Sequence, residues 1–148
     1  MPAPTRSDPF KDYSFLLEID NVPSAAFSDV SGLAAEAEVI EYREGSDKTT
    51  SSRKLPGRVR YGDVTLARGL TTSRDLYDWW MTTVNGIVDR RNAAIILLDD
   101  ARNEALRWVL REVWVSGIEF GGLHAEGNEV LIESVVLTHE GFELVTAP

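Results

Sequence analysis

Residues 41–69 read EYREGSDKTTSSRKLPGRVRYGDVTLARG, a polar and basic stretch within an acidic chain. From Arg43 to Arg60 there are six basic residues and two acidic ones, a local charge of +4; the whole chain carries −9, which leaves −13 for the remainder. Leu55 and Val59 are the only aliphatic residues between those two arginines. The stretch cannot build a core of its own, so we expect residues 43–60 to form a long exposed loop or a projecting hairpin, the arm.

The charge of the arm leaves two interpretations open. Charge runs usually face water, so the arm can be a solvated flexible loop. Alternatively, its positive charge docks on an acidic surface, and the nearest abundant acidic surface is another copy of the same chain. Opposite potentials across such an interface guide encounter and fix register.

The composition predicts one globular domain over residues 1–148. The apolar fraction is 43% and the charged fraction 26%, as in ordinary folded proteins. Without cysteine there is no disulfide framework, thiolate zinc site or cysteine nucleophile. The N-terminus lacks the apolar run of a secretory signal, and no stretch approaches the roughly 18 apolar residues that span a bilayer. The net charge of −9 argues against binding nucleic acid, because phosphate contacts need clustered Lys and Arg.

Alternating apolar residues predict strands on both sides of the arm. In 13–20 the odd positions are apolar, which is the period of a half-buried strand. Residues 34–44 alternate again, with glutamates that predict one wet face. After the arm, 61–68 places Val64 and Leu66 on one face, and we predict that this strand returns to pair with 34–44. The arm would then extend a hairpin.

One segment has helical spacing and predicts a helix over about 73–85. Side chains recur there at intervals of three and four: Leu76, Trp79, Trp80, Thr83, Val84 and Ile87. Thr72 with Asp75 resembles a capping box at the start of this helix. Asn85 with Gly86 supplies a left-handed stop at its end.

Beyond the helix the sequence predicts three more strands. Residues 93–100 form a short apolar run of the buried kind. The segments 106–120 and 128–145 are rich in Val, Ile and aromatic residues and are joined by a glycine-containing loop, which predicts a long closing hairpin. The alternation of the first segment shifts around Arg111 and Glu112, which indicates a β-bulge. The chain is therefore mainly β with one α-helix.

The residues that could carry chemistry form no convincing site. His124 lies in a predicted loop and His139 near a strand end, and neither has the HxH or HExxH spacing of a metal site. The serines of FSDVSGL do not fit the GxSxG elbow of hydrolases. Asp99 and Asp100 stand at a turn, where adjacent carboxylates are usually solvated. We therefore predict no catalytic residue, no metal site and no cofactor.

Five segments, in order along the chain, carry a resemblance to a known family. They resemble the inner tube proteins of contractile phage tails and extracellular contractile injection systems: FSDVSGL (27–33), EYREG (41–45), RKLPG (53–57), YGDVTLARG (61–69) and LYDWW (76–80). The type VI secretion tube protein is similar in fold. The resemblance implies a small antiparallel β-barrel or sandwich with a flanking helix and a long projecting hairpin. It also implies hexameric rings stacked into a hollow tube, with the arm reaching a neighbouring ring.

Two sets of residues become candidates for assembly. The candidate subunit-interface residues lie on the arm: Arg43, Glu44, Lys48, Arg53, Lys54, Leu55, Pro56, Gly57, Arg58 and Arg60. The candidate lumen-facing residues are acidic: Glu36, Glu38, Glu129 and Glu133. Like charge on the lumen would discourage DNA or acidic cargo from sticking.

The predicted function is a structural subunit of the inner tube, without enzymatic activity. Its expected partners are other copies of itself, sheath protein, baseplate and spike hub proteins, and a tape-measure or cargo protein in the lumen. No specific nucleic-acid binding and no membrane insertion are expected. Assembly would occur in the cytoplasm, and the product would be part of a phage tail or an extracellular injection particle. Two alternatives stay open: a tube-initiating ring protein at the baseplate, and a small acidic β-barrel enzyme or ligand carrier.

Overall fold

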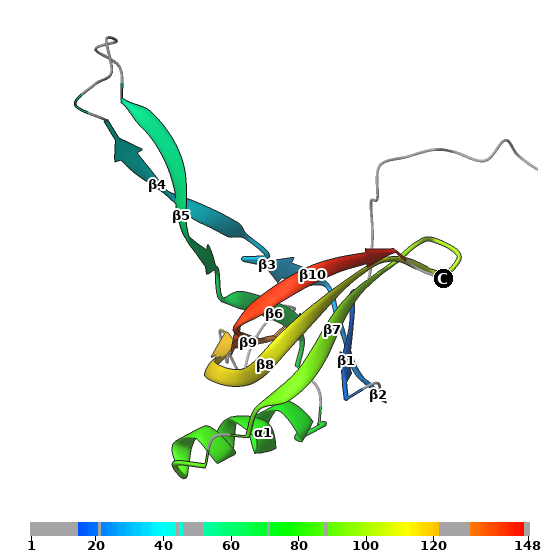
Figure 1. The fold of residues 1–148 in the computed structure, drawn as a ribbon. Coiled ribbons are helices and arrows are strands. Elements are labelled where there is room, and N and C mark those ends of the chain that lie inside the picture. The colour runs from blue at the N-terminus through cyan, green and yellow to red at the C-terminus, as the bar shows by residue number, and fades with distance from the viewer. Residues whose placement is uncertain are drawn as a thin grey trace, which may run out of the picture.

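A computed structural model describes residues 15–20, 22–43, 45, 52–70, 72–87, 89–121 and 131–146. The fold is mainly β with one helix, as predicted (Figure 1). The elements in chain order are β1 (Phe15–Ile19), β2 (Val22–Phe27), β3 (Asp29–Ser31), β4 (Ala35–Tyr42), β5 (Arg53–Tyr61), β6 (Val64–Gly69), α1 (Asp75–Val84), β7 (Arg91–Leu98), β8 (Glu104–Gly121), β9 (Ile132–Thr138) and β10 (Gly141–Thr146).

The long strand β8 joins two antiparallel sheets. Its first part pairs with β7 and β10, and its second part pairs with β9. One sheet therefore runs β2-β1-β7-β8-β10, and the other runs β8-β9-β6-β3. Opposite Arg91 and Ala93 of β7, the register of β8 shifts, and Glu112 there has a φ of 52°. This irregularity confirms the β-bulge predicted around Arg111 and Glu112.

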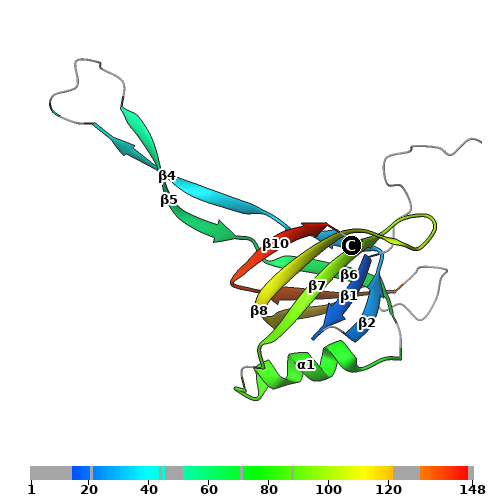
Figure 2. The same cartoon turned by 45° about the vertical axis from the view of Figure 1, so that its right-hand side comes forward.

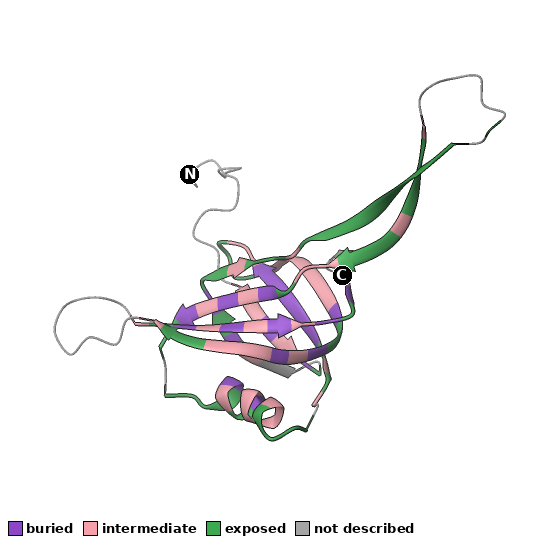
Figure 3. Cartoon of the chain, turned by 90° about the vertical axis from the view of Figure 1, so that its left-hand side faces the viewer, coloured by how far each residue is buried: buried purple, intermediate pink, exposed green. Residues whose placement is uncertain are grey.

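The core lies between the two sheets and against helix α1. Figure 3 shows buried residues alternating with less buried ones along the strands, as expected for sheets that each cover one side of a core. Both sheets and the helix contribute fully buried side chains: Leu17, Ile95 and Leu110; Val64, Leu66, Val115, Val135 and Leu137; Leu76 and Trp79. The arrangement is the small antiparallel sandwich with a flanking helix that the resemblance implies.

Helix α1 is shorter than predicted, because it spans 75–84 instead of 73–85. The predicted capping box is wrong: the N-cap is Arg74, no side chain caps it, and Thr72 lies two residues before the cap position. The predicted left-handed stop is confirmed, since Gly86 has a φ of 76°. Glycine adopts this conformation without the steric penalty of a Cβ.

Polar side chains fix α1 on the body. Leu76 and Trp79 are buried under the helix, and the indole Nε1 of Trp79 donates to the carbonyl oxygen of Asp89 over 2.9 Å. Thr83 Oγ1 donates to the carbonyl oxygen of Val115 in β8 over 2.8 Å. The helix therefore covers one end of the core instead of forming a separate unit.

The strands around the arm pair differently from the prediction. We predicted that 61–68 returns to pair with 34–44, and this is wrong: β4 pairs with β5, and β6 pairs with β3 and β9. The body needs β6 because Val64 and Leu66 are completely buried in its core. The basic residues 53–61 therefore supply the return strand themselves.

The closing hairpin is interrupted once. The segment 128–145, expected to be one strand, contains the two strands β9 and β10, which are separated at His139 and Glu140. Both pair with β8, so the predicted pairing partner is right and the continuity is wrong. The strands predicted over 13–20 and 93–100 are observed as β1 and β7.

The β4–β5 hairpin projects away from the two sheets (Figures 1 and 2). The projecting-hairpin interpretation is therefore confirmed for the described part of the arm. Its strands extend into solvent and do not fold back over their own subunit.

Candidate assembly interface

The β4–β5 hairpin combines an acidic strand with a basic one. β4 carries three glutamates and β5 four basic residues, so the paired strands have a net charge of +1. In register, Glu36 lies opposite Arg60, and Glu41 lies opposite Lys54. The charge of +4 was counted over residues 43–60, so it did not include β4, the acidic strand that pairs with β5. The hairpin is therefore close to electrically balanced, and charge alone does not define its surface.

Most of the predicted interface residues are exposed on this hairpin. The exposed ones are Arg43, Arg53, Lys54, Leu55, Pro56, Arg58 and Arg60, while Gly57 is half-buried. Glu44 and Lys48 lie outside the described residues.

Within the described part of the hairpin, the exposed large apolar side chains include only one of the predicted interface residues, Leu55, which is 46% exposed. Val39 is 61% exposed and Ile40 46%, and Tyr42 and Val59 are exposed as well, but these four were not predicted. The adjacent Val39 and Ile40 gave the available signal, but we assigned them to a half-buried strand of the body. An exposed apolar group of this kind is typical of a surface that binds another protein.

The three candidate lumen residues within the described ranges do not lie together. Glu36 and Glu38 are exposed on β4 of the hairpin, and Glu129 lies outside the described residues. Glu133 is only 2% exposed and forms an ion pair with Arg68. Its assignment to the lumen face is wrong, because it shares the core-facing side of β9 with Val135 and points between the sheets.

A histidine connects the hairpin root to the body. Because the amide of Gly141 donates to Nδ1 of His139 over 3.1 Å, the ring carries its hydrogen on Nε2, which donates to the carbonyl oxygen of Gly62 over 2.8 Å. The rings of Tyr61 and Phe142 pack edge to face, 5.2 Å apart, beside the imidazole. The end of β5 is thus bound to the start of β10.

A glycine makes the other side of the root compact. Gly32 has a φ of 87°, and a Cβ there would collide with the carbonyl oxygen of Asp63. Nearby, the amide of Gly62, just after β5, donates to the carbonyl oxygen of Ala34, just before β4, over 2.9 Å. Both strands of the hairpin therefore leave the body from a fixed root.

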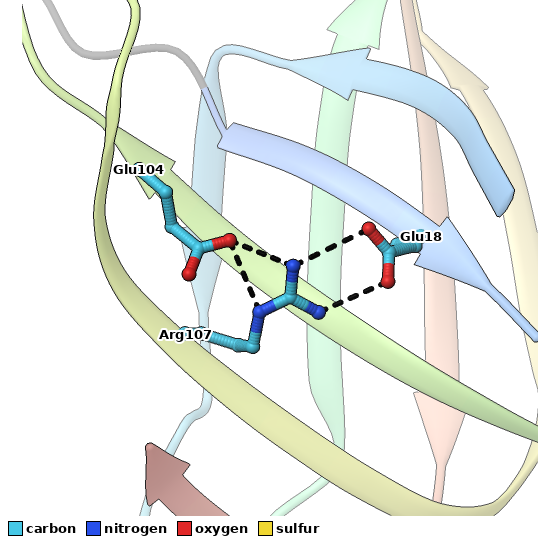
Figure 4. A network of polar contacts seen from close by, with 3 residues as sticks. All are labelled: Glu18, Glu104 and Arg107. Carbon is cyan, nitrogen blue, oxygen red and sulfur yellow. Dashed lines mark hydrogen bonds and ion pairs between the residues drawn. The ribbon is translucent and has the colours of Figure 1, made fainter. Parts of the chain in front are cut away.

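An ion network lies on the outward face of the first sheet (Figure 4). Arg107 Nη1 contacts Glu18 at 3.0 Å, and its Nη2 contacts Glu104 at 2.7 Å. Hydrogen bonds to Glu104 and then Glu18 raise the pKa of Arg107 above its ordinary value. The charges lie beside a shallow pocket that Asp20 and Arg111 also line. The network links β1 to β8 across β7. Its cation and its carboxylates are paired with one another, so we assign it a structural role.

The described residues contain no group of three or more histidine and carboxylate side chains that could hold a metal ion. Within the same ranges, no helix is long and apolar enough to cross a membrane. The geometry at the hairpin is that of a contact surface.

Comparison with protein families gives a match over most of the chain. The sequence model of the family described as T4-like virus tail tube protein gp19 matches residues 11–143. No curated protein sequence is similar enough to count as a relative.

Three solved structures illustrate the similarity in fold. A chain of the anti-feeding prophage baseplate is 24% identical, with a TM-score of 0.74 over 99% of this chain and 98% of that one. A chain of the sheath–tube complex of PVC, an extracellular contractile injection system, is 22% identical, with a TM-score of 0.76 over 95% and 94%. Hcp1 from Flavobacterium johnsoniae is 13% identical, with a TM-score of 0.54 over 90% and 95%.

Proposed function

This chain belongs to the family of the T4-like virus tail tube protein gp19, and we propose that it builds the rigid inner tube of a contractile injection particle or phage-like tail. Its role is structural. Copies close into hexameric rings, and the rings stack around a lumen that carries cargo. Residues 1–148 act as one unit in this assembly.

The projecting β4–β5 hairpin carries the proposal. It extends away from the core, and its exposed apolar side chains include Val39, Ile40 and Leu55. A two-stranded ribbon alone is only marginally stable in water, so a second surface that covers it would stabilise it. In a stack of rings, the neighbouring ring supplies this surface.

Open sheet edges support ring closure. Among the described strands, β10 pairs with β8 alone and exposes Leu144 at 58%, and β2 ends the same sheet on its other side. Unpaired strand edges favour pairing with another chain, and joining them between copies would close one large barrel. Head-to-tail contacts between closed rings then propagate into a tube.

We infer no enzymatic activity and no cofactor for this subunit. Its partners in the proposal are sheath, baseplate and spike hub proteins, together with a tape-measure or cargo protein. The subunit assembles in the cytoplasm before it becomes part of the finished particle. Glu36 and Glu38, both exposed, remain candidates for a surface that cargo passes.

Negative-stain electron microscopy of the purified protein, combined with light scattering, tests the proposal. Hollow tubes of stacked rings are the expected result. Single hexamers that never stack would indicate a tube-initiating ring at the baseplate instead. A stable monomer at all concentrations would contradict the proposal and favour a small carrier or enzyme.

A further inference from the structure

We infer that His139 is an acid-sensitive connection between the root of the β4–β5 hairpin and strand β10. The neutral ring binds Gly62 at the root and Gly141 at the start of β10, and the protonated ring releases Gly141. This inference goes beyond the proposed function, because it concerns how protons control one contact inside a single chain.

The imidazole is a donor on one side and an acceptor on the other. Its Nε2 donates to the carbonyl oxygen of Gly62 over 2.8 Å, and its Nδ1 accepts from the amide of Gly141 over 3.1 Å. A neutral imidazole offers one donor and one acceptor, whereas the protonated ring offers two donors. Both contacts can therefore be made together only while the ring is neutral.

Protonation would place two donors against each other. The new hydrogen on Nδ1 would face the amide hydrogen of Gly141, while the contact with Gly62 would become stronger because its donor is charged. The amide of Glu140 already donates to the carbonyl oxygen of Arg111 over 2.9 Å, so this neighbouring acceptor is occupied. The charged ring therefore stays with the hairpin root and separates from β10.

The groups packed on the ring do not favour a positive charge there. On the side of β8, the guanidinium of Arg111 lies against Gly141, where a Cβ would collide with it. On the side of β5, the ring centre of Tyr61 lies 6.0 Å from that of the imidazole. His139 itself is only 9% exposed, and burial disfavours the charged form of a side chain.

The carboxylates nearest in the chain are engaged with other groups. Asp63 accepts from Thr138 Oγ1 over 3.2 Å, and Glu140 forms an ion pair with Arg90 over 2.8 Å. Both nitrogens of the imidazole contact backbone groups, so neither carboxylate is the partner that would hold an added proton on the ring.

Acid should therefore open this connection. Imidazole is the side chain that ordinarily changes its charge between pH 5 and pH 8. Because the open state accepts the proton more readily than the closed state, its population rises as the pH falls. At pH 7.5 the ring is neutral and the connection is closed. In acid, the packing of Tyr61 against Phe142 would still link β5 to β10, but the hairpin would leave the body from a less rigid root.

Hydrogen exchange of the full chain at two pH values tests the inference. The measured quantity is the protection factor of the Gly141 amide, in which the effect of pH on exchange of an unstructured amide cancels. We expect this factor to fall about tenfold between pH 7.5 and pH 5.0, the size that the loss of one hydrogen bond produces. Amides at the centre of β7 should keep their protection.

Two variants distinguish this ring from other effects of acid. His139→Gln keeps an amide donor and a carbonyl acceptor but takes up no proton in this range, so its Gly141 protection should change little with pH. The chain has one other histidine, His124, which lies outside the described residues. His124→Gln removes that imidazole and should retain the tenfold fall of the wild type.

Either of two results would overturn the inference. The first is equal protection of Gly141 in the wild type at both pH values. The second is a fall in His139→Gln as large as in the wild type, because acid would then act through another group. None of these measurements needs assembled tubes, so their outcome is separate from that of the proposed function.

Nitrogen NMR of the ring in His124→Gln carries the test if His139→Gln does not fold. We expect the hydrogen on Nε2 at pH 7.5, and a second hydrogen on Nδ1 at pH 5.0 together with the loss of protection at Gly141. A ring that stays neutral at pH 5.0, or one that is protonated while Gly141 stays protected, would contradict the inference.

Discussion

Arg68 Nε donates to Glu133 Oε2 over 2.8 Å inside the sandwich, where less than a tenth of either side chain is exposed. The two residues lie opposite each other on β6 and β9. The guanidinium carbon also lies 5.5 Å from the ring centre of Phe27 on β2. The pair therefore connects three strands at one end of an otherwise apolar core.

Removing one partner of this pair should destabilise the fold. Glu133→Ala leaves the guanidinium of Arg68 buried without its counter-charge, and breaking a buried pair in this way typically costs about 3–5 kcal/mol. Chemical denaturation monitored by circular dichroism measures the loss. The double variant Arg68→Met with Glu133→Leu is the informative control, because it replaces both charges with apolar side chains. It should recover most of the stability. If Glu133→Ala alone is as stable as wild type, the pair contributes nothing to the fold.

The same pair illustrates what the sequence could not predict. Apolar patterning correctly indicated three strands: alternation indicated β1, a short continuous apolar run indicated β7, and a high content of Val, Ile and aromatic residues indicated β8. The side on which Glu133 lies depends on the register of β9 against β6, and its partner Arg68 is 65 residues away in the chain. A carboxylate in an alternating strand gives no local sign that it is buried, so we placed it on a wet face.

The hairpin shows a second limit of the sequence. Its existence and its projection could be predicted from the basic, core-poor composition of 43–60. Its pairing could not, because 53–61 and 61–68 both follow the acidic strand closely enough to return to it. Only the burial of Val64 and Leu66 in the body decides between them. Val39 with Pro56 and Ile40 with Leu55 form apolar cross-strand pairs that depend on that pairing, so these pairs could not be predicted for the same reason.

Replacing Arg107 should lower stability modestly, and the loss of stability should be the same at neutral and at alkaline pH. Hydrogen bonds to Glu104 and Glu18 raise its pKa, and a raised pKa contributes stability that is fully present at every pH below the ordinary pKa of arginine. We expect Arg107→Met to cost about 1 kcal/mol, because the network is partly exposed. The difference from wild type should stay constant between pH 7 and pH 10 when unfolding by urea is compared. A difference that disappears within that range would contradict this account.

Replacing His139 should loosen the hairpin root while leaving the core intact. His139→Phe keeps an aromatic ring beside Tyr61, but it leaves the buried amide of Gly141 and the carbonyl oxygen of Gly62 without their partner. We expect faster hydrogen exchange at the Gly141 amide and a loss of about 1–3 kcal/mol. Hydrogen exchange followed by mass spectrometry measures the first effect. Amides at the centre of β7 are the internal control. Their exchange should accelerate only as far as the loss of global stability requires, whereas exchange at Gly141 should accelerate more.

Reversing the two cations at the start of β5 should weaken stacking through charge. Arg53→Glu combined with Lys54→Glu changes the paired strands of the hairpin from +1 to −3, against neighbouring bodies that carry −10 each, the difference between −9 and +1. Repulsion should then oppose docking of the hairpin on a neighbouring copy. We expect short tubes or single rings at low salt, measured by negative-stain electron microscopy and sedimentation.

Salt distinguishes this effect from the loss of apolar contact. The screening length falls from about 10 Å at 0.1 M salt to about 3 Å at 1 M, so the charge-reversed protein should regain part of its tube length as salt is added. Val39→Ser should not recover in this way, because screening does not restore a buried apolar side chain. Long tubes of the charge-reversed protein at low salt would mean that the apolar pairs alone drive docking. If moderate salt restored the tubes of Val39→Ser, the defect of this variant would be electrostatic. That result would contradict the burial of the Val39 side chain in the tube.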